Sequence, residues 1–138
     1  MAVKRGANPT SVAQDKGLFT HVIEIENATV SKTIYISGQV AWNAAGEVVG
    51  AGDLRAQFLQ VYENLRSLVA HAGGTLADVV QLRTYLTSRE LLPTFFAVRN
   101  EQYPTLFPNG AYPTNTLLIV GGLADPDLLL EVEAVAVV

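Results

Sequence analysis

Cysteine is absent from this sequence, and histidine occurs only at positions 21 and 71. Without cysteine the chain has no disulfide framework, no thiolate nucleophile and no cysteine-ligated metal. The acidic residues and the histidines show no metal-ligand spacing, so we expect no bound metal. His71 falls in the last turn of an expected helix, where a cation complements the helix dipole. His21 falls in an expected strand, where a packed histidine is more common than an acid–base group and both interpretations stay open.

Basic residues are few and scattered. Nine Lys and Arg residues stand against thirteen Asp and Glu residues, which gives a net charge of −4. Apart from Lys4-Arg5 the positive charges occur singly. Because nucleic-acid binding rests on clustered phosphate contacts, we expect no nucleic-acid partner. No apolar run approaches the roughly 20 residues that cross a bilayer, and no charged-then-apolar leader opens the chain, so we expect a cytoplasmic protein without a membrane segment.

Apolar residues make up 49% of the 138 residues and charged residues only 16%, which is a rich apolar content for a soluble monomer. A chain of this length predicts one domain, residues 1–138, and the turn signal Asn8-Pro9-Thr10 suggests an irregular segment over residues 1–16. Large exposed apolar patches usually mark contacts between proteins. The apolar surplus therefore indicates a buried subunit interface and an obligate oligomer.

The order of helix and strand signals predicts an α+β fold. Asp53 is a good N-cap, apolar residues recur at spacings of three and four from Leu54 to Ala72, and Gly73-Gly74 ends the pattern. A second helix is expected from Pro93 to about Tyr103, followed by a proline-rich loop. Strands are expected over residues 19–25, 33–36, 48–49, 79–87, 114–120 and 128–138. Both helices are expected on one face of a mixed sheet, with the other face covered by subunit association.

The strand that begins at Thr33 ends in Ser37-Gly38. Glycine weakens a strand interior, so its presence there suggests a bulge or a close approach by another backbone or a ligand. Gln39 and Asn43 follow, and they make this stretch a plausible wall of a site. The alternative is a strand end that only turns a corner.

Glu131 and Glu133 lie in the apolar final strand, and the alternation of side chains puts both on one face. Two carboxylates in such a strand are costly unless they are partnered or solvated. If Glu133 lies in a cleft, desolvation is expected to raise its pKa and to suit it to handle a proton of water. The alternative is an edge strand whose charges face solvent and prevent aggregation.

Taken together, these residues resemble the Rid family, which is also named RidA/YjgF or L-PSP endoribonuclease. The similarity runs from about Gly17 to the C-terminus, and its ordered spacing is specific. The residues that carry it are Tyr35-Ile36-Ser37-Gly38-Gln39, Asn43, Gly46-Glu47-Val48, Gln57, Asn64-Leu65, Ala72-Gly73, Asp78-Val79-Val80, Asn100, Tyr103-Pro104 and Glu131-Val132-Glu133-Ala134-Val135-Ala136.

The resemblance implies a chorismate-mutase-like fold in a homotrimer, with a central β-barrel, outer helices and a small-molecule site in each cleft between subunits. It implies hydrolysis of imine or enamine products of pyridoxal-phosphate enzymes to a 2-keto acid and ammonia, without a cofactor. The matching positions assign Glu133 to the handling of water. They assign substrate binding to Ser37, Gly38 and Asn100, with Phe19 or His21 at the aromatic position.

The sequence departs from the family at Asn115. Members of the family carry an arginine there that holds the substrate carboxylate, whereas this chain has a short neutral amide. A hydrogen bond to a charged group contributes roughly 1.5–3 kcal/mol, against about 0.5–1.5 kcal/mol for a neutral one. Loss of the arginine fork therefore weakens carboxylate binding, unless Arg83, Arg89 or a neighbouring subunit supplies a replacement.

Three functions remain open at this point. The first is a Rid-type hydrolase of an imine, an enamine or a related reactive C–N compound, in which Asn115 contacts a different acceptor and Glu133 handles water. The second is a non-catalytic trimer that binds a small metabolite or a partner protein in the same clefts. The third, a ribonuclease or translation inhibitor, comes from the older family label, and the acidic balance counts against it.

Overall fold

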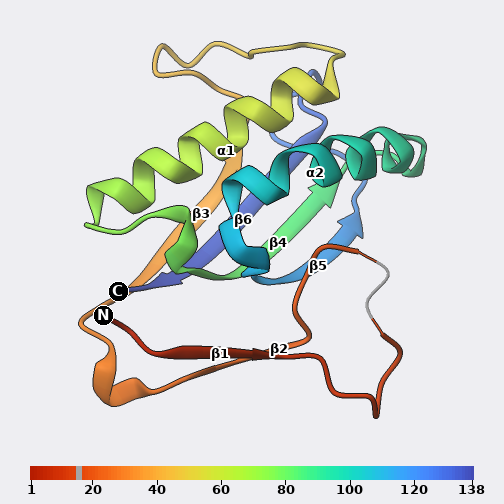
Figure 1. Ribbon diagram of the computed structural model, residues 1–138. Coiled ribbons are helices and arrows are strands. Elements are labelled where there is room, and N and C mark those ends of the chain that lie inside the picture. The colour runs from red at the N-terminus through yellow and green to blue at the C-terminus, as the bar shows by residue number, and fades with distance from the viewer. Residues whose placement is uncertain (15–16) are drawn as a thin grey trace.

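The computed structural model describes residues 1–14 and 17–138. It confirms the α+β architecture, with two helices across one face of a mixed four-stranded sheet (Figure 1). The strands are β1 (Lys4–Ala7), β2 (Val22–Ile25), β3 (Thr33–Val40), β4 (Val79–Leu86), β5 (Thr114–Ile119) and β6 (Leu130–Val137). The α-helices are α1 (Leu54–His71) and α2 (Leu92–Leu106). Short 3-10 helices are η1 (Asn27–Thr29), η2 (Leu76–Asp78), η3 (Arg89–Leu91) and η4 (Pro108–Gly110).

The last strand of the chain lies inside the sheet, whose order is β3-β6-β4-β5. β6 pairs antiparallel with β3 and β4, and β5 runs parallel to β4 at the edge. Side chains alternate along β6, so that Val132 and Ala134 are buried toward the helices and Glu131 and Glu133 are only partly covered on the other face. The alternation thus divides the sheet into a helix-covered face and an open face.

Helix α1 forms as the sequence predicts. The Asp53 side chain accepts a hydrogen bond from the Ala56 N–H at 3.1 Å, which satisfies one free donor of the first turn. Gly73 follows the helix with a φ of +90°, in the left-handed region that glycine adopts most readily. Gln57 is fully buried. Its side chain forms hydrogen bonds with the backbone of Gly50, before the helix, and of Asp127 and Leu129, before β6.

Helix α2 continues past its expected end. The sequence predicts a loop from Pro104, but the helix runs on to Leu106 with this proline inside it. Proline removes one backbone hydrogen bond from a helix interior. The buried side chains of Tyr103 and Phe107 lie on either side of the last turn, with their ring centroids 5.0 Å apart. This packing offsets the loss.

The N-terminal region differs most from the expectation. Residues 1–16 were expected to be irregular, but β1 forms within them and pairs with β2 in a separate two-stranded sheet (Figure 1). The expected strand over residues 19–25 begins only at Val22. The residues before it are held elsewhere, because the Thr20 N–H donates to the Pro113 carbonyl at 3.2 Å. The expected strand at 48–49 is reduced to one bridge, between Trp42 and Val48.

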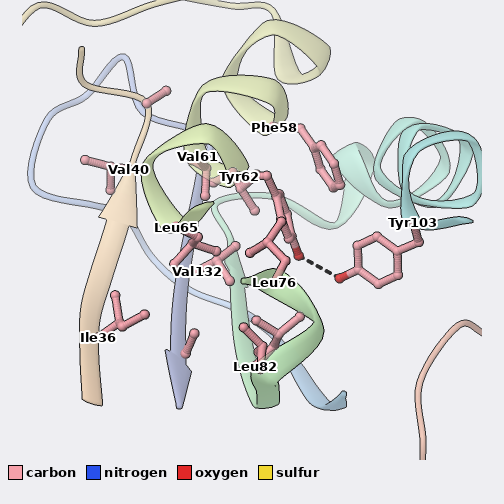
Figure 2. Packing of buried hydrophobic residues seen from close by; sticks show 14 of the residues in the cluster. Ile36, Val40, Phe58, Val61, Tyr62, Leu65, Leu76, Leu82, Tyr103 and Val132 are labelled. Atoms are coloured by element: carbon pink, nitrogen blue, oxygen red, sulfur yellow. Dashed lines mark hydrogen bonds between the residues drawn. The ribbon is translucent and has the colours of Figure 1, made fainter. Parts of the chain in front are cut away.

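The core fills the layer between the helices and the sheet. Figure 2 shows Val61 and Leu65 of α1 facing the strands and Phe58 pointing toward α2. It also shows the hydrogen bond of 2.6 Å between the hydroxyl groups of Tyr62 and Tyr103. That bond pairs two polar groups that are otherwise buried among aromatic rings, and so links α1 to α2. Among the described helices, none is long and apolar enough to cross a membrane.

The open face of the sheet carries apolar side chains with no cover from this chain. Tyr35 of β3 is 81% exposed and Leu118 of β5 is 48% exposed. Val135 of β6 lies opposite Tyr35 in the pairing register, on the same face. An apolar sheet face of this kind is a typical contact surface.

Candidate functional site

Glu133 lies on the open face at the centre of a polar cluster. Arg83 of β4 is its direct neighbour across the pairing of β4 with β6, and Tyr85 lies two residues further along the same face. The Tyr85 hydroxyl donates to Glu133 Oε1 at 2.6 Å, and Arg83 Nη1 donates to the same oxygen at 3.3 Å. Two β4 side chains therefore hold one carboxylate of β6.

These contacts set the charge of Glu133. The hydrogen bond from Tyr85 lowers the pKa of Glu133 below its ordinary value, and Arg83 acts in the same direction. The expectation that desolvation raises the pKa of Glu133 is therefore wrong for this residue, because specific donors outweigh burial. It holds instead for Glu131, whose pKa is raised by burial and then by the charge of Glu133. The face thus presents one firmly ionised carboxylate beside a less acidic one.

A pocket of about 260 Å³ opens beside Glu133. It is lined by Tyr35, Ile36, Ser37, Gln81, Arg83, Glu133, Ala134 and Val135. Two of the expected site residues, Ser37 and Glu133, thus meet in one pocket on neighbouring strands. Of the arginines considered as replacements for the family's arginine, Arg83 lines this pocket, whereas Arg89 lies in η3.

The Ser37-Gly38 step forms a bulge, which is one of the alternatives that the glycine suggests. The expectation that the strand ends there is wrong, because β3 continues to Val40. The register between β3 and β6 shifts between Ile36 and Gln39. A Cβ atom at Gly38 would overlap the carboxylate of Glu131, so only glycine lets this side chain lie against the strand. Gly38, Gln39 and Asn43 line a second hollow of about 410 Å³ with Trp42 and Asn64. Gly38 therefore lines the second hollow and not the Glu133 pocket.

The aromatic candidates lie in another part of the molecule. Phe19 and His21 pack edge to face, with ring centroids 5.1 Å apart. Thr20 between them bonds to the carbonyls of Tyr112 and Pro113, which places the segment beside the start of β5. His21 Nε2 is buried and has no hydrogen-bond partner among the described residues.

Asn115 and Asn100 do not share the open face with Glu133. Asn115 pairs with Leu82 in the β4–β5 register and accepts a 2.9 Å hydrogen bond from the fully buried Thr84. Both of these neighbours belong to the helix-covered face, so Asn115 lies on that face and not on the open side. Asn100 is exposed on α2, where its Oδ1 accepts a 3.3 Å bond from Arg99.

The candidate residues thus form two groups on opposite faces of one chain. The open-face group contains Ser37 and Glu133, and the edge group contains Phe19, His21, Asn100 and Asn115. Sequence reasoning did not assign Tyr85 a role, although its alternation with Gln81 and Arg83 along β4 was visible. Within the described parts of the chain, no group of three or more acidic or histidine side chains has the arrangement of a metal site.

Comparisons with known proteins place the chain in a family. The family model described as Endoribonuclease L-PSP matches residues 16–138. YyfB of Yersinia pestis, a Rid family protein of unknown function, has a crystal structure that superposes with a TM-score of 0.85, at 38% identity over 98% of both chains.

Two structures from Escherichia coli are also similar. TdcF, solved with bound serine, gives a TM-score of 0.68 at 26% identity over 78% of this chain and 81% of its own. The YjgF gene product gives 0.68 at 28% identity, with the same coverage. Since the family model covers most of the chain and YyfB matches nearly all of it, the chain belongs to the Rid family, also named the YjgF or L-PSP family.

Proposed function

We propose that this protein is a homotrimeric, cofactor-independent hydrolase of reactive imines or enamines, of which 2-iminopropanoate is the model substrate. The observation that carries the proposal is the ionised Glu133, held by Tyr85 and Arg83 beside a pocket that also contains Ser37. Membership of the Rid family supports this class of reaction.

The chemistry asks for a base that remains charged at neutral pH. Glu133 takes a proton from water while the water oxygen bonds to the carbon of the C=N group. The protonated Glu133 gives this proton to nitrogen, which yields a carbinolamine. Glu133 then takes the remaining hydroxyl proton and passes it to nitrogen, so that the C–N bond breaks as the C=O bond forms and ammonia leaves. The net reaction consumes one water and yields a keto acid and ammonia. Tyr85 keeps the carboxylate in one orientation during both transfers.

The trimer is part of the proposal because one chain separates the two groups of candidate residues. Glu133 and Ser37 lie on the open face, whereas Asn100 and Asn115 lie toward the helices at the edge strand β5. Packing the open face against a neighbouring chain would cover Tyr35 and Leu118 and bring the edge group of one subunit toward Glu133 of another. Phe19 or His21 then borders the cleft.

The test is hydrolysis of freshly generated 2-iminopropanoate in competition with semicarbazide, which traps the imine that escapes the enzyme. We expect Glu133→Gln to lower the rate by about 10²–10⁴-fold, the usual contribution of general acid–base catalysis. Glu24→Gln, at an exposed position of β2, removes the same charge and should keep the wild-type rate. A wild-type rate in Glu133→Gln would exclude the proposed role.

A second candidate function is a trimer that binds a small metabolite without consuming it. Asn115 in place of the family's arginine favours it, and TdcF holds serine in its crystal structure. A ligand that raises the melting temperature and is recovered unchanged would support this function, because a ligand that binds only the native state stabilises it. Consumption of that ligand would exclude it.

A further inference from the structure

Arg99 of α2 is a buried cation without a counter-ion among the described residues. The residue is only 6% exposed, and its Nε is buried with no hydrogen-bond partner. Its one hydrogen bond to a described side chain is the 3.3 Å contact from Nη2 to Asn100 Oδ1. The ion pairs found within residues 1–14 and 17–138 do not include Arg99.

The surroundings of Arg99 do not replace a negative charge. Its guanidinium carbon lies 4.8 Å from the centre of the Phe96 ring, which offers only the partial attraction of an aromatic face. Burial raises the pKa of Tyr103 to about 12 and that of Tyr62 well above its ordinary value, so both neighbouring phenols are neutral. Burial also lowers the pKa of Arg99, yet arginine stays protonated in proteins. A buried charge of this kind is costly unless an anion reaches it.

Three contacts place the guanidinium of Arg99 at the edge group of candidate residues. A Cβ atom on Gly17 would lie 2.8 Å from Arg99 Nη2, so the segment that leads to Phe19 passes directly over it. Three residues later, Thr20 bonds to Tyr112 and Pro113 at the start of β5. The same Tyr112 stacks on Tyr103, one helical turn beyond Arg99 in α2.

Asn115 lies shortly after the two residues that Thr20 contacts. It follows Pro113 by two residues and lies on the helix-covered side of β5, through its bond to the buried Thr84. Position 115 is that of the family's carboxylate ligand, and in this chain it is a short amide. The guanidinium of Arg99 lies instead on α2, beside Gly17, Phe96 and Asn100.

We infer that Arg99 is the carboxylate-binding residue of this protein, so that its clefts take small organic carboxylates through an arginine on α2 rather than on β5. The inference rests on the proposed function and names the substrate class of the same site. The free Nε–H and a terminal N–H of Arg99 point the same way from one planar group, which is the fork that matches two carboxylate oxygens. Arg83 does not serve this purpose, because it holds Glu133.

The test measures binding and does not depend on turnover. Pyruvate, which carries a carboxylate, and methyl pyruvate, which does not, are titrated by calorimetry into the wild-type protein, Arg99→Met and Arg66→Met. We expect pyruvate, and not methyl pyruvate, to bind the wild type, and Arg99→Met to weaken its binding at least about tenfold, the loss of a charged hydrogen bond. Arg66→Met removes the same charge from an exposed position of α1 and should bind as the wild type does.

A melting measurement and one further variant separate this role from a structural one. Arg99→Met should melt no lower than the wild type in the absence of ligand, because it replaces an unpaired buried charge by an apolar side chain of similar length. The double variant Arg99→Met with Asn115→Arg should regain pyruvate binding, because it returns the guanidinium to β5. Loss of binding with a normal melting temperature, followed by this rescue, supports the inference.

Two results would overturn the inference. They are wild-type pyruvate affinity in Arg99→Met, and no pyruvate binding by the wild type. Failure of the proposed function gives a different result, namely pyruvate binding that depends on Arg99 in a protein that hydrolyses no imine.

Discussion

At the scale of single residues, the site depends on a tyrosine that fixes the charge of a glutamate. Glu131 and Glu133 are two residues apart on one face, yet their pKa values are shifted in opposite directions. Glu133 receives the Tyr85 hydroxyl, whereas Glu131 lies against the backbone of Gly38 and is shifted by burial. The lowered pKa keeps Glu133 charged at neutral pH, where it can orient and polarise a water molecule, but it also makes Glu133 the weaker base of the two.

Replacing Tyr85 by Phe should raise the pKa of Glu133, because the largest cause of its depression is the hydrogen bond that this change removes. A base works when ionised, so activity falls as the pH drops through its pKa, and the acid limb of the pH–rate profile should move to higher pH in Tyr85→Phe. Carboxyl-carbon NMR should show Glu133 titrating below Glu131 in the wild type, with a smaller gap in the variant. Glu133 titrating above Glu131 in the wild type would contradict the assignment.

The sequence predicts which residues belong to this site better than it predicts which side chains they contact. Alternation alone puts Glu131 and Glu133 on one face, and the Ser37-Gly38 step suggests the bulge as one alternative. The contacts of Tyr85 and Arg99 depend on elements far apart in the chain, namely β4 with β6, and α2 with the segment at Gly17. No local sequence pattern contains such pairings, so the roles of Tyr85 and Arg99 become apparent only in the structure.

At the scale of elements, α1 is tied to the site by one buried amide. Gln57 Nε2 donates to the carbonyls of Gly50 and Asp127 at 3.0 and 2.8 Å, and its Oε1 accepts from the Leu129 N–H at 2.8 Å. Leu129 directly precedes β6. The helix therefore fixes the start of the strand that carries Glu133.

Replacing Gln57 by Leu should destabilise the protein by about 3 kcal/mol or more, because three backbone groups lose their partner at roughly 1–3 kcal/mol each. Denaturant unfolding measures this change. Gln60→Leu serves as the control: it removes a similar amide from the same helix, where Gln60 bonds only to Asn64, and should cost less than about 1 kcal/mol. Equal stabilities of the two variants would show that the bonds of Gln57 are unimportant.

Sequence periodicity predicts helix α1 and strands β4 and β6, because each has a long apolar pattern, and α1 also has a clear N-cap. The N-terminal region does not follow in this way. β1 is four residues long and gains its hydrogen bonds only from β2, about 18 positions later in the pairing register. The end of α2 is decided by the packing of Tyr103 and Phe107, which overrides the local preference of Pro104.

At the scale of the whole molecule, the open face and the separation of the candidate residues support one assembly. Apolar side chains of β3, β5 and β6 lack a cover, and the two groups of candidate residues lie on opposite faces of the chain. A trimer accounts for both features. Neither feature follows from the sequence alone, since the apolar surplus of 49% indicates a contact surface without locating it.

Replacing Leu118 by Lys should dissociate the proposed trimer, because it puts a charge on the open face of β5, where the side chain is 48% exposed in the single chain. Sedimentation velocity should give three times the chain mass for the wild type and a single chain mass for the variant. Leu59→Lys, on α1 at 42% exposure, is the matched control and should remain a trimer. A monomeric wild-type protein would contradict the proposed trimer.

The most direct test of the central claim is the rate at which wild-type protein converts freshly generated 2-iminopropanoate, compared with the spontaneous rate in the same solution. The account predicts many turnovers for each Glu133, with pyruvate and ammonia released in equal amounts. Decay at the spontaneous rate, while pyruvate still raises the melting temperature of the protein, would contradict hydrolysis and show a protein that binds without catalysis.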